Sequence, residues 1–171
     1  MRYCFPCRGF LVSITEASGE RSGKSRMGLM LSLIHIFTQA ITRQEAINEA
    51  NLVLETIADY EVDFPVVLDI EDASSANART SNLTKQKATE IAKAFCETIE
   101  AGGYRPMIYT NTKWFTQKLD MHQLTEYDKW LAQYYRVPFF PYAFDIWQYG
   151  KGKVDGISGE VDLNLSFVDY N

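Results

Sequence analysis

The stretch FPVVLDIEDASS, residues 64–75, most constrains how this chain folds. Five apolar or proline positions run directly into three acids, Asp69, Glu71 and Asp72. The run is too short and too β-branched for a helix, and continuous apolarity is typical of a parallel strand that is buried on both faces. A buried strand that ends in carboxylates indicates a sheet whose strand ends open into a polar pocket.

Helical patterns stand on both sides of this strand. The first begins with Thr42 and Glu45 at the spacing of a capping box and continues with apolar residues on one face. The second is predicted from about Thr84 to Ala101, where two glycines end it.

The segments after the second helix are predicted to be mostly strands, namely RPMIYTN, KWLAQYY, FDIWQYG and VDLNLSF, with one short helical stretch near TKWFTQKL. Alternating strands and helices predict a mainly parallel sheet. The strand-rich tail predicts that the second half of a barrel has lost most of its helices. The expected fold class is therefore α/β, a modified TIM-like β/α barrel.

The acids after the buried strand are spaced for catalysis. Side chains alternate along a strand, so Asp69 and Glu71 are expected to point the same way and Ile70 the opposite way. Their Cα atoms would be roughly 6.5 to 7 Å apart, which suits two carboxylates that flank one glycosidic bond. A helix cap, a divalent cation site or a solvent-facing position also fits two acids at a strand end, so spacing alone leaves these interpretations open.

Composition argues against several classes of partner. The chain has 17 basic and 22 acidic residues, a formal net charge of −5, and nucleic acid binding depends on Lys and Arg that displace counterions. No run approaches the roughly 20 apolar residues of a membrane span. Cys4 and Cys7 form a C-x-x-C without the second pair that a zinc site needs, and Cys96 falls on an apolar helix face. No metal, nucleic acid or membrane partner is expected.

Several blocks together resemble one family. PVVLDIED, GYRPMIYTN, YDKWLAQY and FDIWQYGKGKVDGISGEVDLNLSF occur in the order and approximate spacing of the glycoside hydrolase family 25 muramidases, over about Ala40 to Phe167. The resemblance implies hydrolysis of the β-1,4 bond between N-acetylmuramic acid and N-acetylglucosamine in the glycan strands of bacterial peptidoglycan. It also implies a modified β/α barrel that acts without metal or cofactor.

The resemblance assigns roles to individual residues. Glu71 is similar to the general acid, and Asp69 to the carboxylate that orients the substrate's N-acetyl group or stabilises the oxocarbenium-like state. Asp162 is similar to an aspartate of the last strand that lines the same pocket. Substrate-binding positions are expected at Tyr109, Trp130, Gln133, Trp147 and Gln148. For the aromatic residues, core packing is an equally good interpretation.

The N-terminal part departs from the family pattern. The family begins with a strand that carries an aspartate, but no Asp precedes Asp59 in this sequence. RGFLVSITEASG, which includes Glu16, resembles the family's second strand. We therefore expect residues 1–36 to be an aberrant segment, residues 37–171 to form the catalytic domain, and the barrel to lack its first strand. Exposed strand edges and a weakened site would follow.

Two other functions remain open from the sequence. One is an inactive remnant of such a domain that still binds glycan. The other is a chitinase-like barrel enzyme of family 18, which needs a D-x-x-D-x-D-x-E run, whereas Phe64 and Val67 occupy its two upstream acid positions. A monomer that acts on the cell wall is expected, and no clear signal peptide marks its route there.

Overall fold

The computed structural model describes residues 10–11, 35–60, 62–72 and 79–170. Its strands are β1 (Phe10–Leu11), β2 (His35–Phe37), β3 (Val66–Asp69), β4 (Pro106–Asn111), β5 (Asp128–Ala132), β6 (Ile146–Gly152) and β7 (Val161–Ser166). Its helices are α1 (Arg43–Ile57) and α2 (Lys85–Ala101), and shorter helical turns lie at Arg79–Asn82, Trp114–Lys118 and Met121–Gln123.

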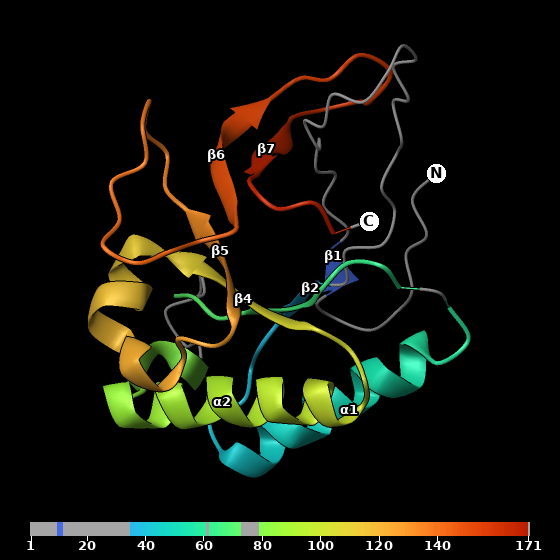
Figure 1. Ribbon diagram of the computed structural model, residues 1–171, viewed down its shortest axis with the longest axis vertical. Helices are drawn as coiled ribbons and strands as arrows, with labels where there is room; N and C mark the ends of the chain where they lie inside the picture. Colours follow the sequence, from blue (N-terminus) through green and yellow to red (C-terminus); the bar gives the residue numbers. More distant parts are fainter. Residues whose placement is uncertain (1–9, 12–34, 61, 73–78, 171) are drawn as a thin grey trace.

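The described strands form one curled sheet in the order of the sequence (Figure 1). Strands β2 to β6 are parallel, whereas β1 is antiparallel to β2 and β7 is antiparallel to β6. The mainly parallel sheet and the mixed α/β class that the sequence predicts are confirmed. Within the described chain β1 and β7 are the outer strands of the sheet, and no pairing joins them.

Strand β1 comes from the stretch predicted to resemble an early barrel strand, and it pairs with β2 through Phe10 opposite Ile36. Glu16, Cys4 and Cys7 lie outside the described residues. The absence of a first barrel strand therefore stays a prediction.

The two long helices begin and end as the sequence predicts. Thr42 caps α1, and its hydroxyl oxygen accepts the Glu45 N–H at 3.2 Å. Thr84 caps α2 in the same way. Gly103 follows the end of α2 with φ = 86°, a left-handed conformation that glycine adopts without strain. No helix in the described part of the chain is long and apolar enough to cross a bilayer.

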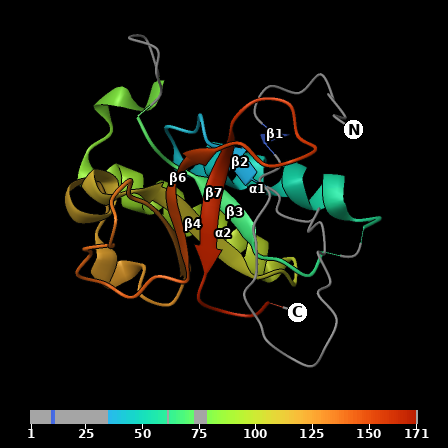
Figure 2. The same cartoon turned by 90° about the horizontal axis from the view of Figure 1, so that it is seen from above.

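The sheet separates two apolar clusters. Both long helices cover its outer face, where Val66 and Leu68 of β3 join Ile91 and Phe95 of α2 (Figures 1 and 2). The smaller cluster lies on the concave inner face and contains Phe64, Val67, Met107, Tyr109, Trp130 and Ile146. Because side chains alternate along β3, the residues that do not face the helices point into the curl of the sheet.

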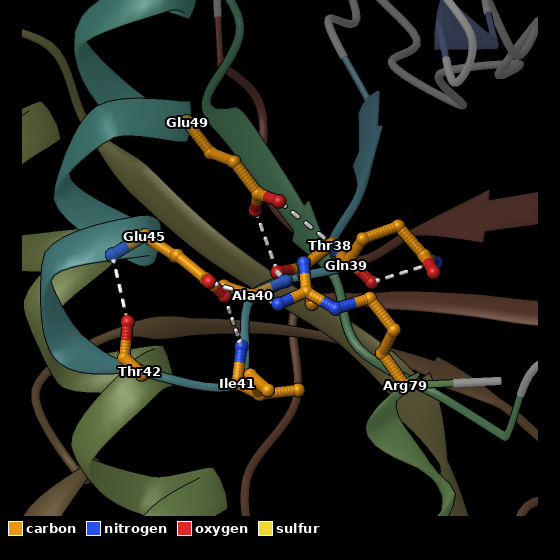
Figure 3. A network of polar contacts seen from close by, with 8 residues as sticks. All are labelled: Thr38, Gln39, Ala40, Ile41, Thr42, Glu45, Glu49 and Arg79. Carbon is orange, nitrogen blue, oxygen red and sulfur yellow. Dashed lines mark hydrogen bonds and ion pairs between the residues drawn. The ribbon is translucent and has the colours of Figure 1, made fainter.

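A polar network ties the end of β2 to α1 (Figure 3). Glu49 accepts hydrogen bonds from the Thr38 hydroxyl at 2.6 Å and from the Gln39 N–H at 3.0 Å, and Glu45 accepts from the Ile41 N–H at 2.8 Å. The Thr38 N–H in turn donates to the backbone carbonyl of Asp69. The network therefore fixes the strand next to the acid-bearing end of β3.

Candidate active site

A pocket of about 540 Å³ opens at the carboxyl ends of the parallel strands. Its lining is mostly polar and comes from β3 to β7 and the connections that follow them: Asp69, Glu71, Tyr109, Asn111, Thr112, Lys113, Ala132, Gln133, Tyr134, Tyr135, Gln148, Lys151 and Asp162. The opening of the buried strand into a polar pocket, predicted from the sequence, is therefore seen in the structure.

Strand β3 delivers two acids to this pocket. Val67 points into the inner apolar cluster, and Asp69, two residues on, points the same way at 5% exposure. Glu71 follows just past the end of the strand, is half-buried and also lines the pocket. Ile70 lies between them and packs in the outer core. The predicted alternation of Asp69, Ile70 and Glu71 is thus present.

Asp162 reaches the pocket from an antiparallel strand. Because β7 runs opposite to β6, its first residues lie at the end of the sheet where the parallel strands finish. Asp162 stands opposite Lys151, whose Nζ is 3.7 Å from its Oδ1. The register shifts between Gln148 and Gly150, and this irregularity adds a residue to β6. Gln148 and Lys151 therefore both line the pocket although an odd number of steps separates them.

Burial and like charges raise the pKa values of the two acids at the end of β3. Burial, and secondly the charge of Glu71, raise the pKa of Asp69 from 3.8 to about 8. Burial also raises the pKa of Glu71, followed by the charges of Asp72 and Asp162, while Lys151 acts in the opposite direction. Two carboxyl groups that cannot both ionise freely form a proton-carrying pair at neutral pH.

Asp72 has a different environment from the two buried acids. Its carboxylate accepts a hydrogen bond from Lys113 Nζ at 2.7 Å, and this contact is the main cause that lowers the pKa of Asp72. Both side chains are about half exposed, so the ion pair itself adds little stability. Its effect on the site is to hold a fixed negative charge beside Glu71.

The amide of Gln148 is held by two tyrosines. Its Oε1 accepts hydrogen bonds from the Tyr109 hydroxyl at 2.9 Å and from the Tyr134 hydroxyl at 2.7 Å. Gln148 is only 2% exposed. With the oxygen doubly occupied, the amide nitrogen is the polar atom of this side chain left to donate to a ligand in the acidic pocket.

Of the other predicted binding residues, Gln133 lines the pocket, whereas the two tryptophans do not. Trp130 is fully buried beneath the pocket, packs edge-on against Tyr109 and donates its Nε1–H to Asn164. Trp147 is also buried, outside the pocket lining, and donates its Nε1–H to the Gln133 carbonyl. Both tryptophans are buried and bonded to protein groups, and their part in substrate binding stays a prediction. Gln133 lines the pocket, but its amide binds protein groups.

Several lining residues were not predicted from the sequence. Asn111 follows Tyr109 by two positions, so strand alternation was a signal for it. Lys151 carried no such signal, because the irregularity in β6 changes which face it occupies. Tyr134 and Tyr135 lie in a connection whose course depends on tertiary contacts.

This arrangement suits proton transfer to a leaving oxygen. Glu71 is the acid that is both open to the pocket and shifted toward its protonated form. Asp69 lies deeper, and Gln148, whose oxygen is held by Tyr109, lines the same pocket. A neutral polar substrate with one labile acetal bond matches these groups better than an anion would.

Comparison with known sequences identifies relatives along most of the chain. The model of the family described as "Glycosyl hydrolases family 25" matches residues 16–157. The match begins within the segment 1–36, and the domain boundary after residue 36 stays a prediction. The uncharacterized protein YegX of Escherichia coli (strain K12) is 30% identical over 141 residues, covering 81% of this chain and 48% of YegX. The chain spans about half the length of the curated relatives it matches.

Solved structures have the same fold. The CTP1L endolysin is 30% identical, with a TM-score of 0.59 over 75% of this chain and 44% of that chain. The modular autolysin LytC from Streptococcus pneumoniae, solved in complex with a synthetic peptidoglycan ligand, has a TM-score of 0.66 at 22% identity, over 75% of this chain and 32% of its own. At that identity the likeness to LytC concerns the fold alone.

Proposed function

This chain belongs to family 25 of the glycosyl hydrolases, and from that premise we propose that it is a muramidase, which hydrolyses the β-1,4 bond between N-acetylmuramic acid and N-acetylglucosamine in bacterial peptidoglycan. The observation that carries the proposal is the pair Asp69 and Glu71, with raised pKa values, at the mouth of a polar pocket. The likeness to the CTP1L endolysin is consistent with a cell-wall glycan as substrate.

Glu71 is the proposed general acid. Its pKa is raised by burial and by the charges of Asp72 and Asp162, so it retains a proton to higher pH than an ordinary glutamic acid. It transfers this proton to the glycosidic oxygen as the bond from that oxygen to the sugar's anomeric carbon breaks. The resulting Glu71 carboxylate then takes a proton from the water that completes hydrolysis.

Asp69 is proposed to hold the N-acetyl group of the sugar that is cleaved. The carbonyl oxygen of that group attacks the anomeric carbon, and positive charge spreads onto the acetamide. Positive charge next to a carboxyl favours its ionised form and lowers its pKa. The positive charge therefore favours loss of the Asp69 proton to water in the pocket, and the resulting carboxylate accepts a hydrogen bond from the acetamide N–H. Asp162 and the Gln148 amide line the same pocket.

The test measures reducing sugar released from purified peptidoglycan by the parent chain, by Glu71→Gln and by the control Glu55→Gln, which alters an exposed residue of α1. We expect release by the parent and the control and none by Glu71→Gln. Borohydride reduction of the products should give muramitol ends. Glucosaminitol ends would reject the proposed bond.

The alternative is a remnant that binds glycan without cleaving it. It predicts no sugar release by folded parent protein, together with sedimentation on peptidoglycan that Glu71→Gln does not change. That pair of results would replace the muramidase proposal.

A further inference from the structure

Exposed apolar side chains gather beside the pocket. Ten large apolar residues of the described chain are exposed, and five of them fall between residues 134 and 142: Tyr134, Tyr135, Val137, Phe139 and Tyr142. Single exposed apolar side chains are ordinary on a protein surface, but a cluster of them marks a binding surface. Of this group, only Tyr134 was given a role in the site above, as a hydrogen-bond donor to Gln148.

This cluster lies in the connection between β5 and β6. Figure 1 shows the connection, in orange, projecting beyond β5 at the end of the sheet from which the β6–β7 hairpin also extends. Tyr134 and Tyr135 line the pocket itself. The apolar surface is therefore continuous with the site that holds the acids.

A buried glutamine fixes the connection. Gln133, 5% exposed, accepts a hydrogen bond from the Phe139 N–H at 2.7 Å and donates to the Phe139 carbonyl at 2.9 Å. The same amide donates to the Thr112 hydroxyl at 2.7 Å. Phe139 is thus bound at both its backbone groups, although its side chain is 59% exposed.

The connection held by Gln133 presents a pair of aromatic side chains to solvent. The rings of Tyr135 and Phe139 lie 4.8 Å apart at 71°, an edge-to-face arrangement. A rigid aromatic surface loses little conformational entropy when a ligand binds, since the side chains are already placed. The aromatic side chains of this connection are therefore preorganised to bind a flat apolar surface.

We infer that Tyr135 and Phe139 form a subsite for a further pyranose ring of the glycan strand, beyond the two sugars that the cleaved bond joins. This inference rests on the proposed function. A pyranose has C–H faces that pack on aromatic rings and a rim of hydroxyls that stays hydrated. The occupant must also continue from the pocket, and the neighbouring sugar of the same strand does so.

The test compares kcat/KM on peptide-free glycan oligomers of two lengths, the shortest that is cleaved and one several sugars longer. Phe139→Ala and Tyr135→Ala should each lose roughly tenfold on the longer oligomer, about the size of one aromatic contact, and much less on the shorter. Phe139→Tyr keeps a ring and should retain the parent value. Val137→Ala, at a residue 71% exposed in the same connection, is the matched control and should change neither.

Equal losses on both lengths, or the same loss in Val137→Ala, would overturn the subsite. So would a loss seen only when stem peptides remain on the glycan, because the occupant would then be peptide. If the parent cleaves nothing, the proposed function fails separately. Calorimetric binding of peptide-free glycan to Glu71→Gln, with and without Phe139→Ala, then decides the subsite, and equal affinities would reject it.

Discussion

Replacing Asp69 by Asn should stabilise the fold while it removes activity. The unfolded chain ionises Asp69 above its ordinary pKa of 3.8, whereas the folded chain keeps it protonated up to about pH 8. The native state therefore binds more protons between these values, and stability falls as the pH rises. At pH 7 the difference is about 3 pH units at about 1.4 kcal/mol each, or about 4 kcal/mol.

Asparagine resembles protonated aspartic acid in shape and never ionises, so the variant avoids this loss. Its advantage in the free energy of unfolding should be close to zero near pH 4, grow to about 4 kcal/mol at pH 7 and level off above pH 8. For a chain of this size that corresponds to a rise of roughly 10 °C in Tm at pH 7.

Urea unfolding followed by circular dichroism at pH 4, 5.5, 7 and 8 measures the difference directly. Asp120→Asn supplies a control of opposite sign, because hydrogen bonds from Gln123 and the His122 N–H lower the pKa of Asp120. Its stability relative to the parent should fall as the pH rises up to about 4, which needs an added point near pH 3, and should stay nearly constant from pH 5.5 to 8. A difference between Asp69→Asn and parent that is the same at pH 4 and pH 7 would refute the reasoning.

Two further changes test the electrostatics and geometry of the pocket. Lys151→Met should move the alkaline limb of the pH–rate profile to higher pH, because Lys151 lowers the pKa of Glu71. The control Lys153→Met should leave this limb in place. Equal shifts in the two variants would contradict a specific effect of Lys151 on Glu71. Tyr134→Phe should reduce kcat about fivefold with an unchanged Tm, since the Gln148 amide loses one of two hydrogen bonds that orient it; unchanged kcat would mean that its orientation does not matter.

Local signals were enough to predict the long elements and the acid pair. Thr42 and Thr84 cap the two helices, and both predictions depend on residues close in the sequence. The Glu45 carboxylate, however, also bonds the Ile41 N–H and Arg79, and Arg79 is distant in the sequence. Prediction succeeded where the interaction partner was local.

Other features of the site depended on contacts between distant segments. Trp147 and Gln148 were both predicted to bind substrate, and because neighbours in a strand point to opposite faces, Gln148 lines the pocket and Trp147 does not. Substrate binding by either residue stays a prediction. The irregularity at Gly150 brings Lys151 to the pocket and has no clear sequence signal. The course of the β5–β6 connection depends on the two hydrogen bonds between the Gln133 amide and the Phe139 backbone. Only the tertiary structure reveals these bonds.

The outer face of the sheet provides most of the apolar packing, and the inner face carries the acids of the site. The outer face packs against two helices and holds most of the buried apolar residues, including Leu68 and Ile70 on the acid-bearing strand. The inner face has a small apolar cluster and, beyond it, the buried Asp69, whose pKa is raised to about 8. Burying Asp69 is unfavourable, but β3 is fixed by the outer core and by the hydrogen bond from the Thr38 N–H to the Asp69 carbonyl. The strand is therefore held in place with the acid buried, and the unfavourable free energy of ionising Asp69 there raises its pKa.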